Sequence, residues 1–184
     1  MRMTMREYQK LAQRTSPDDG HDKLDNGVLG LMGETGEIVD IYKKWMYQSE
    51  VNTELPGDQM AEELGDVLWY LAELAAGIGV GLIDIIGEDF AQIDERTKRK
   101  PAKRTSLRSA IVGLAGRAWQ INRCICKSEW RGTHSHIRRI MLTITHLAHK
   151  VDLTIEEVAI MNINKLKKRY PYGFSARRSM ERYE

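Results

Sequence analysis

The sequence predicts an all-α protein built as a helical bundle, and two observations carry that prediction. Apolar residues recur at the three- and four-residue spacing of amphipathic helices along most of the chain. No pair of short alternating segments joined by a hairpin turn signal is present. Hydrophobic residues make up 42% and charged residues 29% of the 184 positions, as in ordinary globular proteins, and this length suits one compact domain or two small ones.

Capping and chain-breaking signals divide this pattern into elements. Thr4 with Glu7 has the spacing of a capping box that opens a short helix, and Thr154 with Glu157 repeats it before the last long helix. Asp58 follows the chain-breaking segment ELPGD and is expected to cap a further helix. The predicted long helices span residues 22–48, 59–77, 82–97, 107–128, 134–150 and 154–169.

A weak internal repeat relates the two halves of the helical pattern. Residues 30–44 align with residues 113–127 at an offset of 83, and an offset of 73 then keeps the apolar positions of the following helices in register. We therefore predict a duplication, with a first unit in residues 1–100 and a second in residues 101–184, whether or not they pack as one domain. The alternative is that any two amphipathic helices can be aligned by sliding.

The net charge of +2 hides a strong asymmetry between the two halves. Residues 1–95 contain 7 Lys/Arg and 20 Asp/Glu, whereas residues 96–184 contain 21 Lys/Arg and 6 Asp/Glu. An acidic half suits metal cations, and a basic half suits phosphate or nucleic acid. The alternative is that the two halves simply attract each other.

The cysteine content and the N-terminus indicate a cytoplasmic protein. Cys124 and Cys126 are the only cysteines, which excludes a disulfide framework and fits a reducing compartment. The first ten residues lack an apolar core of signal-peptide length. The most apolar stretch is interrupted by Glu73 and Asp84, so no contact with a membrane is expected.

Two acidic pairs on neighbouring predicted helices point to a metal site. Glu34 and Glu37 lie three residues apart in one helix, and Glu63 and Asp66 have the same spacing in the next. Like charges at this spacing repel by about 0.2–0.5 kcal/mol, and both pairs flank an apolar stripe. Antiparallel packing would therefore gather four carboxylates at the rim of the helix interface. A hard divalent cation, Mg²⁺ or Mn²⁺, would offset their repulsion.

The same acidic pairs also fit two rival interpretations. The pairs can form a solvated acidic face without any metal. A di-iron carboxylate bundle is a rival metal site, but it requires Glu-x-x-His pairs, and neither helix has a histidine at the needed position.

The acidic pairs and their surroundings resemble the MazG-like all-α nucleoside triphosphate pyrophosphohydrolases. Asn162 and Lys165 match the Asn-x-x-Lys pattern near the end of the last helix of that family. The resemblance covers most of the chain. The segments that carry it are EYQKLAQRT, NGVLGLMGETGEIVDIYKK, AEELGDVLWYLAELA and NINKLKKRYPYGFSARRS.

The chain departs from the single-unit pattern of that family in two places. The first unit has Asp89 and Gln92 where Asn-x-x-Lys would stand. The second unit replaces the four acids with Arg117, Gln120, His136 and Arg139. We therefore expect one composite site per pair of units, similar to the duplicated, half-degenerate dimeric dUTPases of the same superfamily. The alternative is that the C-terminal tail completes the site of another chain.

The resemblance implies Mg²⁺-dependent hydrolysis of a nucleoside triphosphate to the monophosphate and pyrophosphate, in nucleotide-pool sanitation or control. The four acids would be the metal ligands and catalytic residues, and a homodimer or dimer of dimers would be the assembly. Lys165 and Arg169 would neutralise phosphate charge, and Asn162 would bond to a phosphate oxygen or a metal-bound water. The remaining substrate-binding candidates are Lys44, Trp45 and Tyr70.

Several of these residues, and the chain as a whole, also suit different roles. Trp45 and Tyr70 have apolar spacing, which core packing also explains, and Lys44 also suits a helix end. A nucleic-acid-binding helical protein driven by the basic half is a different class, but the four acids would oppose a nucleic acid backbone. A non-catalytic nucleotide-binding protein is the third hypothesis. The base preference is open, and residues 47–58 are the candidate segment that sets it.

Overall fold

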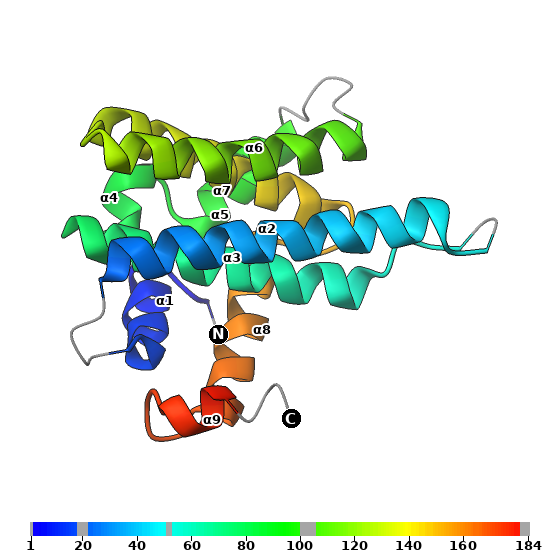
Figure 1. Cartoon of the computed structure of the whole chain (residues 1–184). Coiled ribbons are helices and arrows are strands. Elements are labelled where there is room, and N and C mark those ends of the chain that lie inside the picture. Colours follow the sequence, from blue (N-terminus) through cyan, green and yellow to red (C-terminus); the bar gives the residue numbers. More distant parts are fainter. Residues whose placement is uncertain (1, 18–21, 51–52, 100–105, 181–184) are drawn as a thin grey trace.

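In the computed structural model, which describes residues 2–17, 22–50, 53–99 and 106–180, every regular element is a helix (Figure 1). The predicted all-α class is confirmed. The predicted unit boundary between residues 100 and 101 lies outside the described residues. Among the described helices none alone is long and apolar enough to cross a membrane; only the pair Gly57–Ile78 and Leu82–Arg99, bent by 94°, meets that test together.

Two antiparallel helical hairpins form the centre of the fold. The first is α2 with α3, the second is α6 with α7, and α2 packs against α6 (Figure 1). α8 packs on α3 and α1, while α4 and α5 lie against α7. The helices are α1 (Met5–Ala12), the 3₁₀ helix η1 (Gln13–Thr15), α2 (Lys23–Tyr47), α3 (Gly57–Ile78), α4 (Leu82–Ile86), α5 (Phe90–Arg99), α6 (Leu107–Cys126), α7 (Trp130–His149), α8 (Ile155–Arg169) and α9 (Ala176–Met180).

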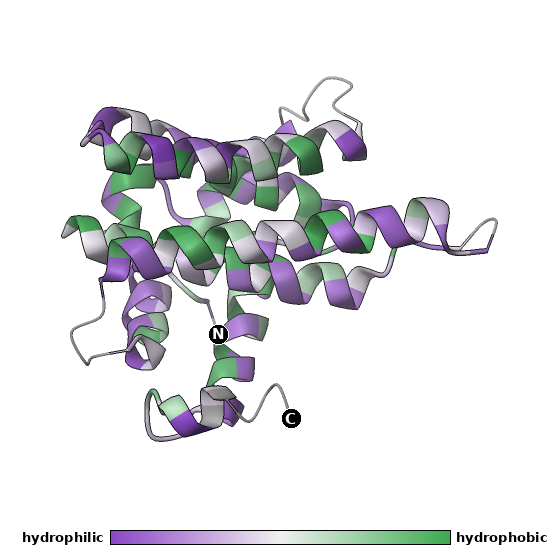
Figure 2. Cartoon of the chain, in the orientation of Figure 1, coloured by the Kyte–Doolittle hydropathy of each residue, from purple (hydrophilic) through white to green (hydrophobic). Residues whose placement is uncertain are grey.

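A single apolar cluster joins these helices. Figure 2 shows apolar and polar residues alternating along each helix, as expected of amphipathic helices around a shared core. Leu31 of α2, Leu64 of α3 and Ile140 of α7 are completely buried in it. The hydrophobic effect therefore holds both hairpins together, and polar side chains at the rims of the helix interfaces remain available for a site.

The capping boxes are confirmed, whereas predicted boundaries at three helices are wrong. Both capping boxes form, at Thr4 and at Thr154. Asp58 is not a cap, because α3 begins at Gly57, two residues before the predicted start, with Pro56 at the N-cap. Asp58 instead places its charge in the first helical turn. α7 begins at Trp130, four residues before the predicted start at 134, with Glu129 at its N-cap. The predicted helix over 82–97 is two helices, since Gly87 adopts a left-handed φ of 83° that ends α4.

Close contact between α2 and α3 depends on glycine. A Cβ added to Gly27 would lie 2.7 Å from Leu74 Cγ and 3.2 Å from the Leu74 backbone nitrogen. On the opposite helix, a Cβ at Gly77 would lie 3.0 Å from the backbone nitrogen of Leu24. The 2.7 Å separation is shorter than real Cβ contacts and the other two are tighter than most of them, so the absence of both side chains permits this close approach. The approach brings the acidic residues of the two helices together.

We predict that Gly27→Ala lowers the free energy of unfolding by about 1–3 kcal/mol, because the added methyl group must push α2 away from α3. Urea denaturation measures the change. Gly33→Ala in the same helix is the matched control, since a Cβ there meets no atom of the described residues within 4 Å. The higher helix propensity of alanine should add up to about 1 kcal/mol at this position. Equal stabilisation of both variants would contradict the packing constraint.

Candidate active site

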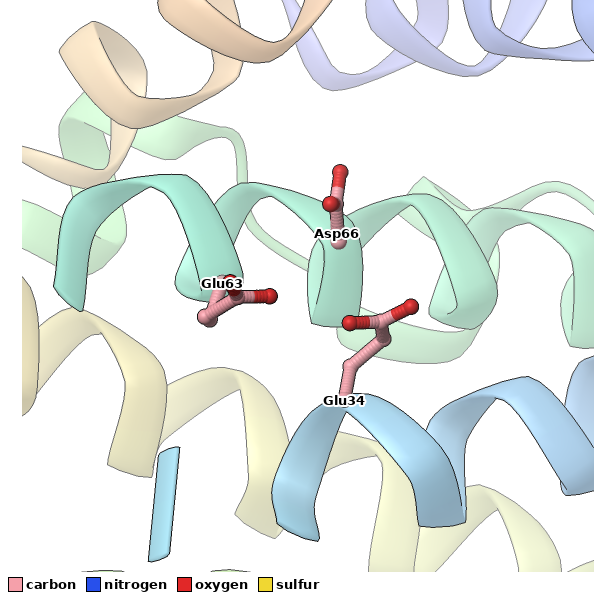
Figure 3. Close-up of side chains that lie close together, drawn as sticks. All are labelled: Glu34, Glu63 and Asp66. Carbon is pink, nitrogen blue, oxygen red and sulfur yellow. The ribbon is translucent and has the colours of Figure 1, made fainter. Parts of the chain in front are cut away.

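Three carboxylates converge between α2 and α3. Glu34 of α2 rises toward Glu63 and Asp66 of α3, as Figure 3 shows. One oxygen of each lies within 4.8 Å of the others, and all three residues are half-buried. No other group of three or more His, Cys, Asp or Glu residues in the described part of the chain meets this criterion. Three carboxylate oxygens suit a hard divalent cation such as Mg²⁺ or Mn²⁺.

The surroundings of the Glu63 carboxyl favour a bound cation at this cluster. Burial raises the pKa of the Glu63 carboxyl, and the negative charges of Asp66 and Glu62 act in the same direction. A hydrogen bond with Glu34 and the charge of Lys165 lower that pKa. The Oε2 atom of Glu63 is buried and has no hydrogen-bond partner among the residues that the structure describes. A cation at the cluster would satisfy that oxygen and stabilise the ionised carboxylate.

The fourth predicted ligand lies outside this cluster. Glu37 follows Glu34 by one helical turn and is exposed to solvent. Asp40, one turn further on, forms ion pairs with Lys43 and Lys44. The structure therefore brings together three of the four predicted acids, and the role of Glu37 as a ligand stays a prediction.

The C-terminal half reaches the acids of its own chain through α8. The Nδ2 atom of Asn162 donates a hydrogen bond of 2.9 Å to Asp66 Oδ1, and Lys165 Nζ lies 2.5 Å from Asp66 Oδ2. Lys165 also lies 3.2 Å from an oxygen of Glu62. Both residues of the predicted Asn-x-x-Lys pair therefore contact the acidic helix α3 within one chain.

A buried tyrosine fixes the orientation of Asn162. The hydroxyl of Tyr8 donates a 2.9 Å hydrogen bond to Asn162 Oδ1, which leaves Nδ2 for Asp66. Burial raises the pKa of Tyr8 well above its ordinary value, so the hydroxyl stays protonated at neutral pH. Sequence reasoning missed Tyr8, because its spacing from Met5 and Ala12 in α1 is that of a core residue.

A cavity of ≈ 330 Å³ lies beside the acids. This volume is at the lower end of the range for small-molecule sites. Glu34, Asp66, Lys165 and Arg169 contribute charged groups to its wall. Its aromatic wall consists of Trp69, Tyr70, Tyr170 and Phe174. A charged end next to an aromatic wall suits a ligand that has an anionic part and a flat ring.

Tyr70 lies against the backbone of α2. A Cβ on Gly30 would lie 1.9 Å from Tyr70 Cε1, so the ring occupies the space that a side chain would fill. The ring also packs edge-on against Trp69, with 4.9 Å between centroids. Tyr70 lines the same cavity as Glu34 and Asp66, and its role as a substrate contact stays a prediction. The ring also packs against Gly30 and Trp69, as expected of a core residue.

A buried carboxylate organises the rest of the cavity wall. Glu73 is 1% exposed and accepts hydrogen bonds from Gln13, Ser16 and Asn26, with Lys23 at 3.7 Å. Asn26 lines the cavity. Because a buried charge is stable only when it is paired and hydrogen-bonded, Glu73 holds the start of α2 against α3.

Lys44 and Trp45 lie away from this cavity. The helical rise from Glu34 to Trp45 is about 16 Å. Lys44 pairs with Asp40, and Trp45 Nε1 donates a 2.7 Å hydrogen bond to the carbonyl oxygen of Thr53. Both line a separate cavity, together with part of the segment predicted to select the base, of which residues 51–52 lie outside the described residues. The structure does not bring these two candidates to the acids.

Comparison with known proteins places the acids in a recognised domain. Residues 24–99 match the model of the MazG nucleotide pyrophosphohydrolase domain. A protein of Mycobacterium phage L5 named Gene 37 protein is 34% identical over 82 residues, which cover 44% of this chain and 72% of that protein. The chain belongs to the MazG family. No solved structure matched.

The MazG domain match separates the two parts of the site. It contains the three clustered acids and Tyr70, but it ends before the second hairpin and α8. Asn162, Lys165 and Arg169 therefore come from outside the matched span, although they contact the acids or line the same cavity.

We predict that Glu63→Gln weakens Mn²⁺ binding at least about 10-fold, because it removes a charged ligand oxygen from the cluster. Isothermal titration calorimetry on the metal-free protein measures the affinity. Glu95→Gln is the matched control, because Glu95 is an exposed residue of α5 that forms an ion pair with Arg99 and lies outside the carboxylate cluster. Unchanged affinity in Glu63→Gln, or an equal loss in the control, would argue against the cluster as the metal site.

Proposed function

We propose that the chain is a nucleoside triphosphate pyrophosphohydrolase that requires a divalent metal. It hydrolyses its substrate between the α and β phosphates, releasing a nucleoside monophosphate and pyrophosphate. The observation that carries the proposal is the three-carboxylate cluster within a MazG domain. The adjoining cavity, with cationic and aromatic walls, supports a nucleotide as the ligand.

Glu34, Glu63 and Asp66 would hold Mg²⁺, with Mn²⁺ as a substitute and Glu37 as a further ligand. The bound ion would supply charge stabilisation on phosphate oxygens and lower the pKa of a coordinated water. The protein's part is to orient the reactants. One of the cluster glutamates would accept the proton of the attacking water. Glu34 and Glu63 are both half-buried, which limits the access of bulk water to their carboxylates.

Lys165 and Arg169 would hold the triphosphate. Lys165 Nζ already lies next to the carboxylates, so phosphate oxygens that approach the metal also approach this ammonium group. Arg169 lines the same cavity one helical turn further along α8. Cationic groups fixed in this way stabilise the charge that develops on the leaving pyrophosphate. Asn162 keeps Asp66 in place through its amide hydrogen bond.

The aromatic wall would take the nucleoside. Tyr70 and Phe174 offer ring faces or edges to a base, and Asn26 offers a polar group held by Glu73. The base itself is left open by these contacts. We further propose that the protein works in the cytoplasm on the free nucleotide pool, as a homodimer or dimer of dimers in which each chain supplies its own Asn162 and Lys165.

We predict metal-dependent conversion of at least one dNTP or NTP to monophosphate and pyrophosphate. Ion-exchange chromatography of the products, with and without Mg²⁺, measures it across the eight common nucleotides. Glu63→Gln should lower kcat at least about 100-fold. Lys165→Met should lower kcat/KM by roughly 10²–10³, because it removes one fixed donor to the phosphates.

The exposed α5 variant Glu95→Gln should keep full activity and serves as the control for this assay. Release of diphosphate and phosphate would show that the proposed cleavage position is wrong. An absence of turnover with metal-dependent nucleotide binding retained would support the non-catalytic nucleotide-binding protein instead.

A further inference from the structure

The second hairpin is basic where the first is acidic. Residues 107–149, which form α6, α7 and their connection, contain seven Lys/Arg and one Glu. Among them, Arg117 of α6 and both His136 and Arg139 of α7 stand at the positions that the internal repeat matches to Glu34, Glu63 and Asp66. The basic cluster, meaning these three residues, has no part in the proposed hydrolysis.

Burial supports the matching of the two hairpins. The buried residues of α2 are Gly27, Val28, Leu31, Thr35 and Ile38, and at the offset of 83 they fall on the buried residues Ala110, Ile111, Leu114, Ala118 and Ile121 of α6. At the offset of 73, the start of α3 aligns with the start of α7. The start of α4 aligns with the start of α8 at the same offset. The basic cluster therefore occupies the rim of its hairpin that corresponds to the acidic cluster. The duplication itself stays a prediction.

The members of the basic cluster lack a counter-charge. Within the described residues, none of the three forms an ion pair with a carboxylate, and the guanidinium of Arg117 makes one hydrogen bond, of 2.9 Å, to the carbonyl oxygen of Gly113. The Nδ1 atom of His136 and the Nε atom of Arg117 are buried and have no hydrogen-bond partner in the described part of the chain. Burial lowers the pKa of His136, and the charges of Arg117 and Arg139 lower it further. His136 and Arg139 lie one helical turn apart on α7, and α7 packs on α6, which carries Arg117.

Cationic side chains on two packed helices, without an ion pair to a carboxylate of the described residues, would be stabilised by an anion bound among them. Guanidinium groups bind phosphate through paired N–H donors, and a neutral imidazole adds one N–H donor. We propose that Arg117, His136 and Arg139 form an anion site that takes the phosphate groups of a free nucleotide or of pyrophosphate.

The charge distribution favours a small anion over a nucleic acid chain. α2 packs directly on α6 and exposes the acidic residues Asp25 and Glu37. An extended phosphate backbone that crossed α6 would meet this acidic helix and be repelled by it. A pyrophosphate or nucleotide is short enough to bind the three side chains without reaching that surface.

The test is titration of the metal-free protein with pyrophosphate, observed through the imidazole signals of His136 in ¹H–¹³C NMR spectra. Loss of one set of signals in His136→Gln assigns them. We expect a saturable shift of these signals, and binding at least about 10-fold weaker in Arg139→Met, which alters an exposed side chain and should leave the fold intact. Arg117→Met should have the same effect.

Two matched variants make the result specific. Arg108→Met removes an exposed arginine from the first turn of the same helix, and Lys165→Met removes a cation from the carboxylate site; neither should change the shift of His136. No shift at millimolar pyrophosphate, or equal weakening by Arg108→Met, would overturn the proposal. Tighter binding of a single-stranded oligonucleotide through the same residues would also overturn it, in favour of nucleic acid.

Discussion

The Asp66 carboxylate joins the two halves of the chain into one site. Asp66 belongs to the carboxylate cluster with Glu34 and Glu63. Its Oδ1 accepts a hydrogen bond from Asn162, and its Oδ2 accepts one from Lys165, both of α8. A carboxylate held at both oxygens cannot rotate freely, so the metal-facing and phosphate-facing parts keep a fixed relation. The close approach of α2 and α3, which glycine permits, sets the position of Asp66 relative to Glu34.

The fold class followed from the sequence because helical periodicity and capping are local. Thr4 and Thr154 cap their helices as their spacing predicts. The division between α4 and α5 did not follow, because the left-handed conformation of Gly87 depends on how both flanking segments pack. The start of α3 at Gly57 was missed for a similar reason: a Pro-Gly-Asp run fits several starting positions equally well.

The convergence of Glu34, Glu63 and Asp66 could be predicted because helical spacing fixes which side chains share a face. The separation of Trp45 from the acids also follows from the sequence, as a helical rise of about 16 Å. The cavity that Trp45 lines does not, because its other wall includes Thr53 of the connection to α3. The contact of Tyr8 with Asn162 was not predicted for a different reason. A tyrosine at core spacing gives no sign in the sequence that its hydroxyl meets a buried amide.

The start of α8 is held by contacts outside the site, and the length of the helix from that start sets where Asn162 and Lys165 lie. Its first backbone N–H, at Ile155, bonds to the buried Asp94, and its second residue, Glu156, accepts from the N–H of Met3. Because each residue advances a helix by about 100° and 1.5 Å, one inserted residue before Asn162 would turn it away from Asp66. Over evolutionary time this first half of α8 should keep its length.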